Sequence, residues 1–273
     1  MMSVLRTLSR VATLALALTL VSPDTGTASG LIRLTDRDDL FGWEAVGRVD
    51  LGGEGFCTGV LIAPELVLTA AHCLFDQTRA ARPLKDITFH AGLRDGDAIA
   101  RSGVARFAVA TGYDPHTGTS ADNVRADAAL LELSDPIPSA TAAPFALHDR
   151  PVKGDALSVV SYGQGRDAAL SWQRNCNLLG RGQGLVAFDC NVTFGSSGAP
   201  VFTDGGRRAR IVTLVVAGHK DADGGTVAYG MDLAPVVAAL KQQLRAMPRA
   251  EPRSKPSSTS GARSISGAKF ARP

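Results

Sequence analysis

A serine between glycines stands in the segment Gly195-Ser196-Ser197-Gly198-Ala199-Pro200. Nucleophilic acyl transfer needs a hydroxyl, an imidazole that takes its proton, a carboxylate that orients the imidazole, and backbone N–H groups that hold the oxyanion. A glycine two residues before Ser197 lets the backbone turn so that the N–H groups of Gly195 and Ser197 point at one spot. We therefore predict Ser197 as the nucleophile and Gly195 with Ser197 as the oxyanion hole. A plain Gly/Ser turn is the alternative interpretation of this segment taken alone.

The imidazole is predicted to come from the segment Thr69-Ala70-Ala71-His72-Cys73. His72 follows an apolar run and adjoins a cysteine, so its backbone is held where a proton acceptor is needed. A core histidine with a satisfied hydrogen bond is the alternative. The other histidines lie in no comparable setting, and we assign them no catalytic role: His90, His116, His148 and His219.

Asp127 is the predicted carboxylate, because it opens the apolar run Ala128-Ala129-Leu130-Leu131. An acid beside such a run becomes partly buried and must find a hydrogen-bond or charge partner, and His72 would provide one. Asp122 is the rival, but polar residues surround it, and a solvated loop suits it better.

The elements that must position these side chains are mostly short strands. Apolar runs broken by turn residues predict strands at 59–62, 66–69, 87–91, 105–110 and 127–133, a linker that begins at Asp135-Pro136, and a second series at 156–161, 185–188, 200–202, 211–217 and 226–229. Residues 233–247 instead place apolar side chains at a helical period, which Pro248 ends. The remainder, 248–273, has too little apolar content to pack, and we predict a disordered basic tail there.

Together these motifs resemble the trypsin/chymotrypsin-like serine peptidases. TAAHC at 69–73, DAALLEL at 127–133 and GSSGAPVF at 195–202 occur in the order His, Asp, Ser. The resemblance covers about residues 40–247. Cys190-Asn191 and Trp43-Glu44-Ala45-Val46-Gly47 are similar to the bacterial glutamyl-endopeptidase (V8-like) branch. The resemblance implies an all-β peptidase domain over 29–247, with two antiparallel six-stranded β-barrels (about 40–135 and about 150–232) and a C-terminal α-helix (233–247).

The resemblance also implies which residues line the substrate pocket. The residue six positions before the nucleophile, Asn191, is expected at the pocket base and carries no charge that could pair with a lysine or arginine. The other expected pocket residues are Val192, Val216, Ala217 and Gly218, which form a small and mostly apolar surface. Burying a charged side chain there would be costly, so we predict cleavage after small or medium apolar residues, with His219 just outside the register.

One departure from the family concerns activation. Animal trypsins carry an aspartate immediately before the serine, which receives the amino terminus freed by cleavage. This chain has Ser196 there and no R-[IV]-[IV]-G-G sequence. We therefore do not expect trypsin-style zymogen activation.

Residues 1–28 are predicted to be a signal peptide. Arg6 and Arg10 precede the apolar run VATLALALTLV at 11–21, and small residues follow. That run is too short for a membrane span, so we expect a secreted or periplasmic protein with no stable membrane anchor.

Export favours disulfides for the four cysteines, which allow three pairings. We predict that neighbours pair, Cys57 with Cys73 and Cys176 with Cys190, which closes two short loops. A four-cysteine zinc site has no C-x₂-C pair to support it, and we expect no metal and no cofactor.

Charge excludes a nucleic-acid partner. The tail 248–273 holds six of the 29 Lys/Arg and one of the 26 Asp/Glu, so the rest of the chain is slightly acidic. We expect a monomer that acts on polypeptide substrates. Two alternatives remain open: a catalytically silent relative that serves as a binding module, and an acyl hydrolase on another fold. The second is disfavoured because α/β-hydrolases have the order Ser, Asp, His.

Overall fold

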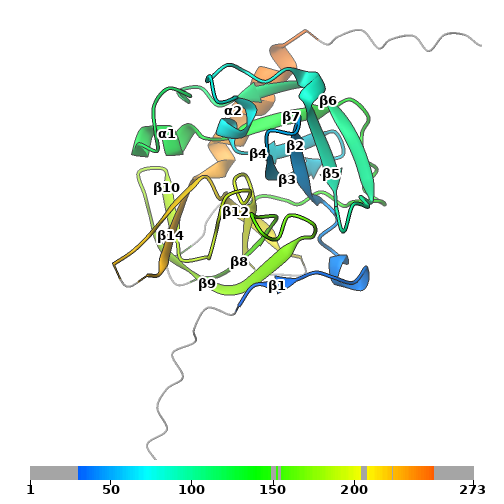
Figure 1. Cartoon of the computed structure of the whole chain (residues 1–273). Coiled ribbons are helices and arrows are strands. Elements are labelled where there is room, and N and C mark those ends of the chain that lie inside the picture. Colours follow the sequence, from blue (N-terminus) through cyan, green and yellow to red (C-terminus); the bar gives the residue numbers. More distant parts are fainter. Residues whose placement is uncertain (1–29, 149–151, 153–154, 204–207, 223, 249–273) are drawn as a thin grey trace, which may run out of the picture.

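The computed structural model describes residues 30–148, 152, 155–203, 208–222 and 224–248. Within these residues the chain forms two β-sheet halves that lie against each other, followed by a helix at the C-terminal end (Figure 1). The predicted signal peptide (1–28) and, except for Pro248, the predicted tail (248–273) lie outside the described residues.

The first half is a closed antiparallel barrel of six strands in the order β2-β3-β4-β7-β6-β5. Alternate residues of β2 and β5 are buried, as expected for strands with one face on a core. The barrel strands are β2 (Val46–Leu51), β3 (Phe56–Ala63), β4 (Leu66–Thr69), β5 (Ile87–Ala91), β6 (Ala100–Val109) and β7 (Ala129–Leu133), with 3₁₀ turns η1 (Asp38–Leu40), η2 (Ala71–Leu74) and η3 (Leu84–Asp86).

A short helix, α1 (Ala121–Ala126), stands where no helix was predicted. Its N-cap, Ser120, accepts a hydrogen bond from the Asn123 N–H at 3.2 Å, which satisfies one of the free N–H groups of the first turn. Asp127 is therefore not the first residue of a strand, as the sequence suggested, but the C-cap of α1, and β7 begins two residues later. Six residues are too few for a helical period to be visible in the sequence.

The second half differs from the predicted six-stranded barrel. Its eight strands form one curled sheet in the order β12-β11-β8-β9-β10-β14-β13, with β1 paired to β9. The strands are β1 (Ile32–Arg33), β8 (Ala156–Ser161), β9 (Ser171–Gly182), β10 (Leu185–Phe188), β11 (Pro200–Thr203), β12 (Arg210–Leu214), β13 (Ala217–Lys220) and β14 (Thr226–Met231). Strand β9 was not predicted, because its outer positions are polar and no apolar run marks it.

The curled sheet comes close to closing where β12 approaches β14, but no ladder between these strands is present in the described residues. The Thr213 hydroxyl donates to Met231 O at 2.8 Å, and Val216 N–H donates to Tyr229 O at 3.0 Å. Gly230 permits this approach, because a Cβ atom there would lie 2.1 Å from Leu214 O. Two isolated hydrogen bonds thus replace the edge pairing of a full barrel.

Helix α2 (Leu233–Ala246) lies over the first barrel although it follows the second half in sequence. It packs against β6, β7 and β12 and buries Leu233, Val237, Leu240 and Leu244, as the helical period predicted. Just beyond its end, Arg106 of β6 donates to Met247 O at 2.6 Å. No helix in the described part of the chain has the length and hydropathy of a membrane span.

Two disulfides are present, and both join neighbours along the chain. Cys57 of β3 is bonded to Cys73 of η2, and Cys176 of β9 is bonded to Cys190 beyond β10. The described residues contain no free cysteine.

Replacing Cys176 and Cys190 together by alanine is expected to lower the free energy of unfolding by about 3 kcal/mol, because the link closes a loop of about 15 residues. Urea unfolding of the two-residue variant and of the unchanged protein measures the difference. Peptide mapping without reductant is the control, and a peptide that joins Cys57 to Cys176 or Cys190 would contradict the pairing.

Candidate active site

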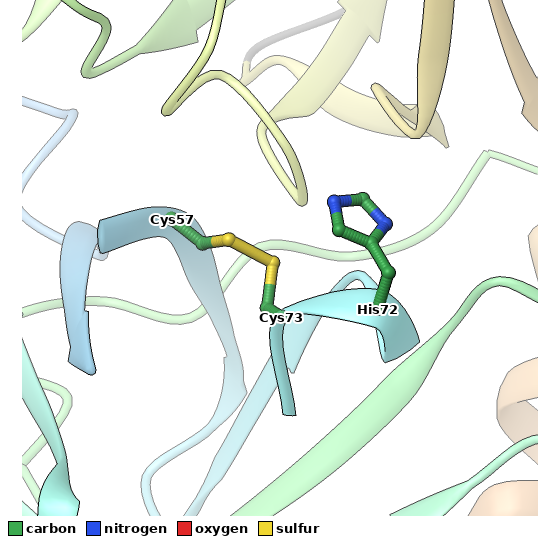
Figure 2. Close-up of side chains that lie close together, drawn as sticks. All are labelled: Cys57, His72 and Cys73. Carbon is green, nitrogen blue, oxygen red and sulfur yellow. A yellow bond between two sulfur atoms is a disulfide. The ribbon is translucent and has the colours of Figure 1, made fainter. Parts of the chain in front are cut away.

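His72 lies on η2, directly after the buried strand β4. The Cys57–Cys73 disulfide ties this turn to β3, and Figure 2 shows the His72 ring beside that link. The backbone at His72 is thus held by strand β4 before it and by the disulfide of Cys73 after it.

The Asp127 carboxylate holds His72 with both of its oxygens. Oδ2 lies 2.7 Å from His72 Nδ1, and Oδ1 accepts the His72 backbone N–H at 2.9 Å. An ionised carboxylate can only accept, so Nδ1 carries the proton and Nε2 is left as the acceptor. Asp127 is buried, at 7% exposure, so His72 supplies the partner that burial of this acid requires.

Tyr113 borders the same carboxylate. Burial first, and then the negative charge of Asp127, raise the pKa of the Tyr113 phenol far above its usual range. The hydroxyl is therefore neutral at every working pH and adds no charge beside the pair.

The segment around Ser197 is a tight turn. Ser196 N–H donates to Thr193 O at 2.9 Å, and Gly195 takes a left-handed φ of 87°, as the third residue of a type II turn requires. Gly198 N–H donates to Val215 O at 2.7 Å. The N–H groups of Gly195 and Ser197 donate to no backbone carbonyl of the described residues, unlike those of Ser196 and Gly198.

Thr58 of β3 fastens this turn to the first barrel. Its N–H donates to Ser197 O at 2.9 Å, and its hydroxyl donates to Gly195 O at 2.9 Å. The same hydroxyl accepts Tyr162 N–H at 3.1 Å. One fully buried threonine therefore joins the turn to both halves of the molecule.

The fit around the turn leaves no room for larger residues at its two glycines. A Cβ atom on Gly195 would lie 2.3 Å from the Phe56 ring, and one on Gly198 would lie 2.3 Å from Thr69 Oγ1. Both glycines also have positive φ values. The glycines that marked the motif in the sequence are therefore required by packing and by backbone conformation.

His72, Asp127 and Ser197 all line one cleft of about 630 Å³. No hydrogen bond joins the Ser197 hydroxyl to His72 among the described residues, and such contacts often tighten only when substrate binds. The Ser197 hydroxyl and the His72 imidazole line one cleft, and the two unused backbone N–H groups belong to the turn that carries Ser197. These are the parts that acyl transfer needs.

Four of the five residues predicted to form the pocket line this cleft: Val192, Val216, Ala217 and Gly218. Asn191 does not. Its N–H donates to Gln173 Oε1 at 2.7 Å, and it lines an adjoining hollow with Asp189. Its placement at the pocket base stays a prediction, and its backbone partner comes from β9, a strand that the sequence did not predict.

Sequence reasoning missed several other residues of the cleft wall. His219, stacked on Tyr229 at 5.7 Å, lines it although we had placed it outside the register. The remaining unpredicted wall residues include Arg79, Tyr113, Phe194, Lys220 and Thr226. Phe194, which adjoins Gly195 and is 82% exposed, lies beside a motif and could have been inferred from the sequence.

A metal has no evident place at this site. Cys57, His72 and Cys73 offer ligand atoms within 4.8 Å of one another (Figure 2). The two sulfur atoms are bonded to each other, and a metal-binding cysteine must be a thiolate. This cluster is therefore a disulfide beside a histidine rather than a metal centre.

Comparison with known proteins places the chain in a family. The profile described as "Trypsin-like peptidase domain" matches residues 57–209, more than half of the chain. The chain belongs to the trypsin-like peptidase domain family. The resemblance drawn from its motifs is thereby confirmed.

Among relatives in this family, the chain is 32% identical over 125 residues to serine protease 56 of Homo sapiens, and 26% identical over 155 residues to glutamyl endopeptidase of Bacillus licheniformis. These matches cover 44% and 56% of the chain but only 19% and 47% of the relatives, so the chain spans less than half of the length of either one.

A solved structure, that of a Glu endopeptidase in complex with MPD, is similar in fold. Its TM-score is 0.66 at 19% identity, and the match covers 80% of this chain and 97% of the other. The similarity is one of fold, with a closed barrel in the first half of this chain and an unclosed, curled sheet in the second.

Replacing Thr58 by valine is expected to slow labelling of Ser197 by a fluorophosphonate probe by at least about tenfold, because small displacements of reacting groups are costly. Stability should fall by about 1–3 kcal/mol, since Tyr162 N–H and Gly195 O lose a buried partner. Labelling rates and urea unfolding test both effects.

Thr213→Val is the matched control for this change. Thr213 is equally buried and donates to Met231 O, but it does not line the cleft. Its replacement should cost stability without slowing the labelling. Equal labelling rates for the Thr58 variant and the unchanged protein would contradict the role of Thr58.

Proposed function

We propose that the chain is an exported serine endopeptidase whose catalytic residues are His72, Asp127 and Ser197. The observation that carries the proposal is the 2.7 Å contact of Asp127 Oδ2 with His72 Nδ1 in a cleft that Ser197 also lines. Family membership supports the same reaction class.

In the proposed mechanism Ser197 Oγ attacks the carbonyl carbon of the scissile peptide, and His72 Nε2 takes the hydroxyl proton. Asp127 keeps Nδ1 protonated and stabilises the imidazolium that forms. The N–H groups of Gly195 and Ser197 hold the negative oxygen of the tetrahedral intermediate. His72 then gives its proton to the leaving amine, and water releases the acyl group by the same steps in reverse order.

The character of the cleft supports an apolar side chain before the scissile bond. Val192, Val216 and Ala217 carry no charge. Gly218 lies close to Val192, because a Cβ atom built on Gly218 would lie 3.3 Å from Val192 Cγ2. His219 and Lys220 lie on the same wall. These two basic residues give the alternative specificity, cleavage after an acidic side chain. The Bacillus relative is named a glutamyl endopeptidase.

The organisation of the chain completes the proposal. We assign residues 1–28 to a signal peptide, 29–247 to the peptidase domain and 248–273 to a basic tail. The two disulfides suit an oxidising compartment, which supports a secreted or periplasmic protein. The proposed partners are polypeptide substrates, and the proposed state is a monomer that needs no cofactor.

Ser197→Ala should abolish peptide hydrolysis, with a loss of about 10⁶ in kcat, while the fold is kept. Asp127→Asn should lower kcat by about 10⁴, because the amide favours the wrong histidine tautomer. Casein digestion and a chromogenic peptide measure activity, and circular dichroism checks the fold.

Asp122→Asn is the control for the aspartate, because the Asp122 side chain is 96% exposed and should tolerate the change. The proposed nucleophile is wrong if Ser197→Ala keeps more than about a thousandth of the activity. A folded wild-type protein that neither cleaves peptides nor reacts with a fluorophosphonate would instead indicate a silent binding module.

Digestion of a peptide library should give cuts mainly after small or medium apolar residues. Selectivity should be loose, since each added methylene contributes only about 1–3 kcal/mol. Mass spectrometry of the products reports the cleavage sites.

His219→Gln distinguishes a cleft that selects apolar side chains from one in which His219 selects glutamate. The substitution should leave an apolar preference unchanged. A dominant preference for glutamate that this substitution removes would overturn the apolar assignment.

A further inference from the structure

Arg166 lies behind the Ser197 turn, in the loop that follows β8. Its Nη2 donates to Ser196 Oγ at 2.9 Å and to Ser161 Oγ at 3.1 Å, and its Nη1 donates to Ser161 O at 2.8 Å. Both serines are fully buried. The guanidinium group is therefore hydrogen-bonded to the residue that precedes the proposed nucleophile.

No carboxylate pairs with this guanidinium in the part of the chain that the structure describes. Burial lowers the pKa of Arg166 to about 10, so the group is still protonated at neutral pH. Arg166 is only partly buried, but a guanidinium group that loses part of its hydration without a carboxylate partner stabilises a fold little. Hydrogen bonds to Ser161 and Ser196, rather than an ion pair, are therefore what this arginine supplies.

The surroundings of Arg166 converge on one hydroxyl. Ser196 Oγ accepts from Arg166, donates to Tyr162 O at 3.1 Å, and lies 3.4 Å from Thr193 N. Thr193 begins the turn that contains Gly195. Hydrogen bonds thus connect the cation through Ser196 to the start of the turn.

Gly163 makes room for this arrangement. A Cβ atom there would lie 2.7 Å from Arg166 Cζ and 2.8 Å from Thr193 Cγ2. The guanidinium and the Thr193 methyl group thus both pack against the backbone of Gly163, where a larger residue would displace them.

We propose that Arg166 is a positioning residue that holds segment 193–198 so that the N–H groups of Gly195 and Ser197 stay directed at the reacting carbonyl. The role rests on the proposed function. Because the cation is a side chain of the folded domain, the turn needs no amino terminus freed by cleavage in order to become ordered.

Arg166→Met removes the charge and the donors while keeping a long side chain. We expect kcat to fall about 10- to 100-fold and KM to change less than about threefold, because an oxyanion hole acts on the transition state. Affinity for a peptide boronate should fall with kcat, since the boronate adduct also uses those N–H groups.

Arg208→Met is the matched control. Arg208 also donates to backbone carbonyls, Pro144 O and Ala143 O, and burial also lowers its pKa, but its hydrogen bonds do not reach segment 193–198. Its kcat should equal that of the unchanged protein. An Arg166→Met variant with unchanged kcat and boronate affinity would overturn the proposal while leaving the proposed function intact.

Arg166→Lys is a second variant that keeps the proposal testable if Arg166→Met fails to fold. The ammonium can still donate to Ser196, so activity should be largely restored at neutral pH. Burial depresses the pKa of a lysine, so the donor is present below that pKa and is lost as pH rises through it. The kcat profile should gain an alkaline fall that the wild type lacks. A folded lysine variant that is inactive, or one whose profile matches that of the wild type, would contradict the role.

Hydrogen exchange tests the same idea without activity. The amides of Ser196 and Gly198 are hydrogen-bonded, and Arg166→Met, but not Arg208→Met, should speed their exchange at least about tenfold. Unchanged exchange would overturn the proposal even if the protein proved to be no peptidase. Faster exchange in a protein without peptidase activity would support the positioning role and reject only the proposed function.

Discussion

The hydrogen bonds from Thr58 to the Ser197 turn are the interaction on which the candidate site depends. The histidine and aspartate come from the first barrel, whereas the serine comes from the second half. Thr58 N–H to Ser197 O and Thr58 Oγ1 to Gly195 O, both 2.9 Å, cross that boundary at the turn itself. Other hydrogen bonds also cross between the halves, such as Tyr162 Oη to Leu93 O at 2.9 Å, but those of Thr58 end on the turn that carries the serine.

General packing is nevertheless substantial at the boundary. Trp43 contacts Phe145, Trp172 and Phe202, with ring centroids between 5.1 and 5.8 Å apart, so aromatic side chains from both halves share one core. Helix α2 reinforces the boundary by crossing from the second half onto β6 and β7. Burial of this kind is strong but not directional, and the hydrogen bonds of Thr58 supply the direction.

The two halves differ in a way that suits their tasks. The closed barrel has no free edge, and it carries the His72–Asp127 pair, whose geometry must not vary. The curled sheet ends at β13, which forms part of the cleft wall with His219 and Lys220. Side chains on a wall at a sheet edge can change with little effect on the core, and the His72–Asp127 pair in the barrel is then left undisturbed.

The sequence by itself determined the parts of the site that depend on neighbouring residues. The glycines around Ser197 reflect positive φ angles and close packing, and the apolar runs beside His72 and Asp127 reflect burial. The period of α2 and the pairing of cysteines 14 and 16 residues apart are equally local. Such features leave a signature because one stretch of chain must satisfy them.

Only the tertiary structure decided the contacts that join distant stretches. Thr58 and Gly195 are 137 residues apart, and Arg166 reaches Ser196 across 30. Gln173 of β9 binds the Asn191 N–H across 18 residues, and no ladder among the described residues joins β12 to β14 to close the second half. Hydropathy and spacing report which face of an element is buried, but a hydrogen bond between two loops depends on how the sheets curl, and no local pattern encodes that.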